Sequence, residues 1–229
     1  MRFITFILLF TALNSSEQEI SKDIQITEGS DTAFWAKYHF PDIEKLSLIS
    51  PNENTNFFRI SSSKYYLELS EHSNKIFFYV NEIWDNQQTG EAFIKSYEIK
   101  PDQIKKITAL IDLFKINEIP SDKFIKKWTH GFDGITYIIE NKTDNLYSFK
   151  NYWTPSSQEN FEQAEAILKF TNQLDEIVEY ITKRKEFEKE IPFYGWTYNG
   201  SMIITRVISD TKAYLKYKRT KKKQLKNKD

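Results

Sequence analysis

The chain has 229 residues, enough for one sizeable domain, and its 32 basic and 32 acidic residues give a formal net charge of zero. It contains no cysteine, which excludes a disulfide framework, a thiolate nucleophile and thiolate metal ligands. With three histidines, six glycines and no HExxH, GxSxG or phosphate-binding glycine loop, the sequence predicts no cofactor and no metal site.

The first residues have the pattern of an export signal. Arg2 gives a positive start, residues 3–13 form an apolar run, and small or polar residues follow at 14–16. The apolar run is shorter than the about 20 residues that span a bilayer. We therefore predict a signal peptide at residues 1–16, export to the periplasm or cell exterior, and no transmembrane span in the mature chain. The alternative is a buried N-terminal strand or helix.

A single α+β domain is predicted for residues 33–208, after a flexible, acidic lead-in at residues 17–32. Residues 33–50 have no clean period, and their aromatic side chains, Phe34, Trp35, Tyr38 and Phe40, are expected to pack a short helical turn onto the domain. Aromatic and branched residues alternate with polar ones in four strand candidates. These candidates are residues 56–62, 64–70, 75–84 and 92–100. Turn-forming residues separate them, which is typical of antiparallel strands joined in sequence.

Beyond the fourth strand the period changes to that of a helix, over residues 101–114. Two further strands follow at 135–140 and 146–153, and then a long helix with apolar residues from Phe161 to Ile181. Ser156 with Glu159 predicts a capping box before that helix.

The order of these elements predicts the architecture. The strands come in consecutive groups and do not alternate one by one with helices. This order favours an antiparallel β-sheet with two main helices packed on one face. Asn199 and Gly200, between two strand-like runs, predict a C-terminal β-hairpin with a type I′ turn.

Residues 209–229 form a predicted basic C-terminal tail. From Lys212 onward there are nine Lys or Arg and one Asp, so the preceding residues must sum to about −8. One interpretation is a solvated, frayed end, and the other is a peripheral contact with an anionic lipid or polysaccharide. Nucleic acid is not an expected partner of an exported protein.

The most patterned stretch of the chain begins at His130. Gly131 and Gly134 bracket Asp133, which predicts a tight turn with positive φ at both glycines. The Asp133 side chain is then expected to cap backbone N–H groups, so that the residues have structural roles.

Two functional interpretations accompany the structural one. His130 and Asp133 are candidates for an acid–base pair at the mouth of a strand. Alternatively, Trp128, His130, Asp133 and Trp153 contribute to a binding surface. No catalytic residues are assigned.

This part of the sequence resembles an uncharacterised family of exported bacterial proteins with the motif GxDGxx[WY]xxE, followed by Tyr and W[ST]P. The matching residues are Phe114, Ile119, Pro120, Gly131, Asp133, Gly134, Tyr137, Glu140, Tyr147, Trp153, Thr154 and Pro155. The chain departs from the family pattern at three positions. Tyr137 stands where the family usually has Trp, Thr154 where it has Ser, and Tyr152 where it commonly has Arg. The missing Arg argues against a shared anion-binding site. The resemblance implies export and a sheet-plus-helix core, without an established activity.

Three functions follow as hypotheses. The first is a non-enzymatic exported protein that binds a macromolecule, either an envelope component, a glycan or a partner protein. The second is a small polysaccharide hydrolase that uses two carboxylates, which the 32 acidic residues leave open. The third is a protective partner of an exported toxin or enzyme. A deep cleft with paired carboxylates would favour the hydrolase, and exposed aromatic rings would favour binding.

Overall fold

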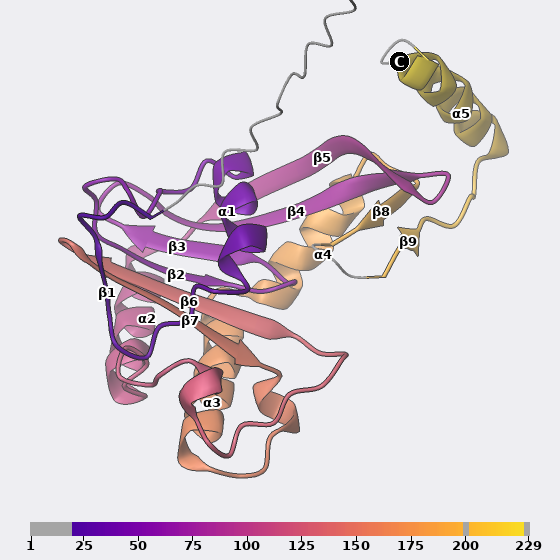
Figure 1. Ribbon diagram of the computed structural model, residues 1–229. Coiled ribbons are helices and arrows are strands. Elements are labelled where there is room, and N and C mark those ends of the chain that lie inside the picture. The colour runs from indigo at the N-terminus through magenta and orange to yellow at the C-terminus, as the bar shows by residue number, and fades with distance from the viewer. Residues whose placement is uncertain (1–19, 199–201, 227–229) are drawn as a thin grey trace, which may run out of the picture.

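The computed structural model describes residues 20–198 and 202–226, and in these residues one nine-stranded sheet forms the centre of the molecule (Figure 1). Its order is β1-β7-β6-β2-β3-β4-β8-β9, and β5 pairs with β4 off this path. The strands are β1 Gln25–Ile26, β2 Phe57–Ser61, β3 Tyr66–Ser70, β4 Asn74–Trp84, β5 Gln87–Glu98, β6 Thr136–Thr143, β7 Leu146–Trp153, β8 Gly195–Thr197 and β9 Ile204–Thr205. All pairs are antiparallel except β1 with β7. The predicted mixture of helices with a mostly antiparallel sheet is confirmed.

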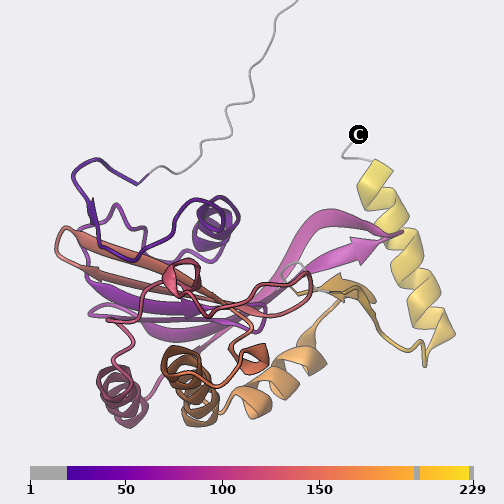
Figure 2. The ribbon, with the colours of Figure 1, turned by 60° about the horizontal axis from the view of Figure 1, so that its bottom comes forward.

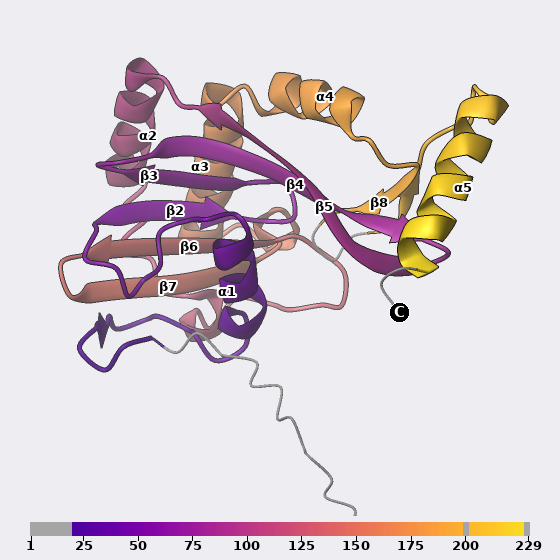
Figure 3. The same ribbon diagram turned by 90° about the horizontal axis from the view of Figure 1, so that it is seen from above.

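Helices cover both faces of this sheet. The described residues contain α1 Ala36–Lys45, α2 Pro101–Leu113, α3 Glu162–Ile177, α4 Tyr180–Glu190 and α5 Thr211–Lys226, with short 3-10 turns at Asp122–Phe124 and Pro155–Ser157. Figure 3 shows α2, α3 and α4 on one side of the sheet and α1 on the other. The short helical turn expected at residues 34–40 overlaps α1, which contains Pro41. This helix covers the second face of the sheet, whereas helices were predicted on one face only.

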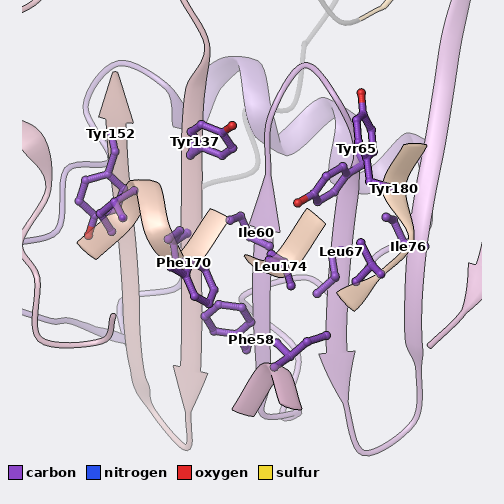
Figure 4. Close-up of a cluster of buried hydrophobic side chains, with 14 of the residues drawn as sticks. Phe58, Ile60, Tyr65, Leu67, Ile76, Tyr137, Tyr152, Phe170, Leu174 and Tyr180 are labelled. Atoms are coloured by element: carbon purple, nitrogen blue, oxygen red, sulfur yellow. The ribbon is translucent and has the colours of Figure 1, made fainter. Parts of the chain in front are cut away.

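Alternation along the strands builds two apolar cores. In β2, Phe58 and Ile60 pack into the larger core under α2, α3 and α4, while Phe57 belongs to the smaller core under α1. Figure 4 shows the larger core, in which Phe170 and Leu174 of α3 lie over the strands. Burial of each such large side chain contributes about 1.5 to 3 kcal/mol, so both faces stabilise the sheet.

The predicted long helix is two helices. α3 ends at Ile177, and Glu179 adopts a left-handed conformation with φ of 55° before α4 begins. Gln103 donates a hydrogen bond to the carbonyl of Ile177 (2.5 Å), and Lys183 donates to that of Val178 (2.7 Å). These side chains supply hydrogen-bond donors to carbonyl groups that have no helical partner between α3 and α4. The predicted capping box is also wrong, because α3 begins at Glu162, well after Ser156.

The C-terminal elements extend the sheet away from α1. β8 pairs with β4 and with β9 in antiparallel register. The predicted type I′ turn at 199–200 and the predicted signal peptide at 1–16 lie outside the described residues. Helix α5 lies beside the far end of the β4–β5 hairpin, on the opposite side of the molecule from α2 (Figure 2).

Candidate ligand-binding site

A buried ion network lies between the sheet and α1. Arg59 is at its centre, because the strand register places it directly opposite Glu68 on β3 and Glu140 on β6. Its Nη1 atom lies 2.8 and 2.9 Å from the two oxygens of Glu140, and Nη2 lies 2.7 Å from Oε2 of Glu68. Nη2 also donates to the carbonyl of Ile49. All three charged side chains are buried, so their mutual pairing is what makes burial tolerable.

His39 of α1 completes this network from above the sheet. Its Nε2 atom lies 2.5 Å from Oε2 of Glu140, and the hydroxyl of Tyr147 donates to Oε1 of the same carboxylate (2.6 Å). On its other side, Nδ1 lies 3.4 Å from Oγ of Ser61. The imidazole stacks on Tyr66 with a ring separation of 5.6 Å and an interplanar angle of 17°. The ion network therefore fixes α1 on the sheet at this point.

The charges in the network change the pKa of its members in opposite directions. Burial alone would raise the pKa of Glu140, but Arg59 and His39 outweigh it and lower that pKa to about 2. Burial alone would lower the pKa of Arg59, and the carboxylates of Glu140 and Glu68 raise it instead. Both groups therefore stay ionised at neutral pH.

A cavity of about 420 Å³ opens beside this network, between α1 and the ends of β2 and β6. Its lining includes four aromatic residues, His39 and several hydroxyl groups. The aromatic and hydroxyl residues are Phe34, Trp35, Tyr38, Tyr66, Ser61, Ser62, Ser63 and Thr136. We call this cavity the aromatic cleft.

Two of its rings are unusually open to solvent. Phe34 is 53% exposed and Tyr38 is 56% exposed, although both contact other aromatic rings. Phe34 meets Trp35 edge to face at 5.0 Å, and Lys37 lies 5.2 Å above Phe34 and 4.8 Å above Tyr38. The rings are thus held in place while their surfaces stay accessible, as in a stacking platform.

The aromatic cleft is better suited to binding than to nucleophilic catalysis. Ser61, His39 and Glu140 follow one another with the connectivity of a catalytic triad. However, Ser61 is only 1% exposed, and both oxygens of Glu140 are already held by Arg59. Among the described residues, no group of His, Asp and Glu side chains could hold a metal ion.

Trp128, one of the predicted site residues, is part of the core. It is buried, and its indole N–H donates to the carbonyl of Trp153 (2.8 Å). Its ring contacts Tyr152 and Phe161, each at 5.7 Å between centroids. The structure therefore gives Trp128 a packing role and removes it from the predicted binding surface.

His130 is paired with Asp122 and not with Asp133. Its Nε2 atom lies 3.2 Å from Oδ2 of Asp122, a buried carboxylate that also accepts a hydrogen bond from the backbone N–H of Trp153 (2.7 Å). Asp133 is exposed, and in the described part of the chain its carboxylate makes no hydrogen bond. The capping role predicted for Asp133 thus belongs to Asp122. The His130 ring lies 6.3 Å from that of Trp153, outside the residues that line the aromatic cleft.

The predicted positive φ at Gly131 and Gly134 is wrong. Among the described glycines, only Gly29 and Gly90 have positive φ. A Cβ atom at Gly131 would lie 2.8 Å from the Trp153 ring, and one at Gly134 would lie 1.9 Å from Oγ1 of Thr154. Close approach of the neighbouring side chains, and not backbone freedom, requires glycine at both positions.

Sequence reasoning missed most of the ion network and the aromatic cleft. Glu140 and Tyr147 of the network, and Gly134 of the cleft, were singled out only as part of the motif. A signal was present, because Arg59 and Glu68 each stand in the middle of a strongly apolar strand. A charge at such a position is seldom buried without a partner, and adjacent strands with opposite charges predict the pair.

Comparison of the chain with protein-family models, curated proteins and solved structures finds no match in any of the three. The resemblance to a family of exported proteins therefore stays a prediction. No helix among the described residues combines the length and apolar character needed to cross a bilayer.

Proposed function

We propose that this is an exported binding protein without enzymatic activity, and that it holds a glycan in the aromatic cleft. The observation that carries the proposal is the pair of open rings, Phe34 and Tyr38, at the edge of a cavity lined with hydroxyl groups. The apolar C–H faces of a sugar ring can stack on the aromatic rings of the cleft. The hydroxyl groups around the sugar ring can form hydrogen bonds with the hydroxyl groups that line the cleft.

The ion network supports binding by making the cleft rigid. His39 lines the cleft and is fixed by Glu140, while Tyr66 stacks on the imidazole and donates to Oδ2 of Asp42 (2.7 Å). A wall whose side chains are already ordered loses little conformational entropy when a ligand binds. Pre-organisation of this kind favours affinity for a weakly interacting ligand.

Polysaccharide hydrolysis is less well supported. It requires one carboxyl group that can donate a proton and a second that contacts the sugar or its attacking water. Glu140, which contacts His39 in the lining of the aromatic cleft, is buried and paired with Arg59, and its low pKa makes it a poor general acid at neutral pH. Glu68 is also buried and paired with Arg59, and Asp42 accepts a hydrogen bond from Tyr66.

A glycan array tests the proposal with a matched pair of variants. Wild-type protein is expected to be retained on a defined subset of envelope or dietary glycans. Phe34→Ala combined with Tyr38→Ala should lower that signal about tenfold or more, because two stacking contacts are lost. Phe124→Ala combined with Phe132→Ala removes two exposed rings outside the cleft and should leave the signal unchanged. Retention on no glycan, or equal loss in both variants, would contradict the proposal.

Export is supported by the sequence of residues 1–16 and has its own test. Expression in a bacterial host followed by intact-mass analysis of the exported fraction should give a chain that starts near residues 16–19. A soluble exported species that still begins at Met1 would contradict this part of the proposal.

A further inference from the structure

Helix α5 is fastened to the sheet by a buried lysine. Lys221 is buried, and its Nζ atom lies 2.5 Å from Glu82 of β4 and 2.9 Å from Glu91 of β5. Tyr217, one turn earlier, donates to the same Glu82 carboxylate and packs its ring 5.8 Å from that of Trp84. The basic C-terminal segment is thus a docked helix over its described length, with one face turned toward the hairpin.

Six other basic side chains of α5 face solvent. The exposed ones are Lys212, Lys216, Lys218, Arg219, Lys222 and Lys223. Among the ion pairs of the described residues, Lys221 is the only member from α5. The helix has eight basic residues and no acidic one, so it presents a concentrated positive surface.

A cavity of about 550 Å³ lies under this surface, between α5, β8, β9 and the end of β4. Arg206, Lys218 and Lys222 line it, against a single acidic residue, Asp85. Ile203 and Ile208 add apolar walls. The cavity therefore combines excess positive charge with apolar surface, which suits an amphiphilic anion.

Exposed apolar side chains surround the same region. Val207 is 85% exposed and Met202 is 87% exposed, and Ile208 and Leu215 are also open to solvent. Val207 and Ile208 lie between β9 and α5, Leu215 lies in α5, and Met202 lies just before β9. Figures 2 and 3 show this segment at one end of the molecule, away from α1.

We propose that α5 and the β9–α5 segment form a docking surface for an anionic phospholipid bilayer. The basic side chains contact the lipid headgroups, the cavity accepts a headgroup, and Val207 inserts among the acyl chains near the interface. Each basic residue close to an anionic surface adds about 1 kcal/mol of attraction, and exposed apolar residues add to it. This surface is separate from the aromatic cleft and does not depend on the function proposed for that cleft.

The distribution of charge supports a fixed orientation on such a bilayer. Residues 212–229 have nine basic and one acidic residue, and since the whole chain is neutral the preceding residues sum to −8. The acidic body is repelled by an anionic membrane while α5 is attracted. The exposed Val207 and Met202 favour a bilayer over a soluble polyanion, because a polyanion offers no apolar phase to receive them.

Flotation with vesicles of phosphatidylcholine, with or without an equal part of phosphatidylglycerol, tests the proposal. Wild-type protein should bind only the anionic vesicles, and more weakly as salt is added. Lys218→Gln combined with Lys222→Gln should reduce that binding about 30-fold. Lys126→Gln combined with Lys127→Gln removes the same charge from another exposed site and should leave binding within about twofold. Equal binding by both double variants would overturn the proposal.

Val207→Asn distinguishes a bilayer from a soluble polyanion. This variant should bind anionic vesicles several-fold more weakly than wild type, while its retention on heparin stays unchanged. An unchanged affinity for vesicles, or wild-type binding to heparin with no binding to vesicles, would contradict bilayer docking.

Discussion

The described residues form two buried ion networks, one under α1 and one under α5, and the two differ in how completely the protein encloses them. Around Arg59, each carboxylate comes from an adjacent central strand, and Arg59, Glu68 and Glu140 are all buried. Around Lys221, Glu82 is buried but the side chain of Glu91 is 40% exposed. The first network lies inside the sheet-and-helix core, and the second joins one helix to the end of a hairpin.

The same kind of interaction therefore has two different roles in this protein. If a partner of Arg59 is removed, the remaining charges have no access to water unless the fold opens. If Lys221 is removed, α5 can detach and water can reach Glu82 while the sheet stays folded. We therefore expect the first network to determine global stability and the second to control local docking.

The largest effect is expected for Arg59→Met, which leaves Glu68 and Glu140 buried without a cation. The free energy of unfolding, measured with urea, should fall by about 3 to 5 kcal/mol. The triple variant Arg59→Met, Glu68→Gln, Glu140→Gln removes all three charges together and should recover at least half of that loss. If the triple variant were less stable than Arg59→Met, uncompensated charge would not be the reason.

Glu140 should make the protein sensitive to acid. Its pKa in the folded chain is about 2, below its ordinary value of 4.5, so its stabilising effect is complete above pH 4.5 and is lost as the pH falls toward 2. The resulting loss is about 3 kcal/mol. Urea unfolding of wild type and Glu140→Gln across this range should show a steeper decrease in wild type. Parallel curves would mean that Glu140 does not contribute.

Lys221→Met should release α5 without unfolding the domain. Amide hydrogen exchange in residues 211–224 should accelerate about tenfold or more, corresponding to a local loss of about 1 to 2 kcal/mol. Exchange in β2, β3 and β6 should stay at the wild-type rate. Faster exchange in these central strands would show that the α5 network also supports the whole fold.

The smallest expected difference in stability is between variants of two aspartates near His130. Asp122→Ala should lower stability by about 1 to 2 kcal/mol, because the backbone N–H of Trp153 loses its buried acceptor. Asp133→Ala, at an exposed position without a described hydrogen bond, should change stability by less than about 0.5 kcal/mol. The melting temperatures of the two variants test this difference. A lower melting temperature for Asp133→Ala than for Asp122→Ala would show that Asp133 is the capping residue.

Local periodicity made much of this fold predictable. The first three strands and α2 were predicted close to their observed bounds, because alternation and a 3.6-residue period are properties of short segments. The fourth strand was predicted at residues 92–100, but β5 already begins at Gln87. The break between α3 and α4 was missed because Glu179 adopts positive φ without being Gly or Asn. Helix α1 was predicted only as a short helical turn, because its sequence, interrupted by Pro41, has no clear period.

The candidate site was less predictable, because it depends on which strands are neighbours. Arg59 meets Glu140 across 81 positions of sequence, and His39 meets Glu140 across 101. Nothing local to any of these residues specifies the pairing. The motif near His130 attracted attention through its pattern, yet its glycines and Trp128 prove to serve close packing.

Chemical-shift mapping by NMR tests most directly the claim that the aromatic cleft is the glycan-binding site. The isotope-labelled protein would be titrated with the glycan that the array retains most strongly. If the cleft binds the glycan, shift changes should be confined to the residues around 34–38, 61–63 and 134–138, with α5 unaffected. Changes centred on α5, or on the face covered by α2 and α3, would contradict it.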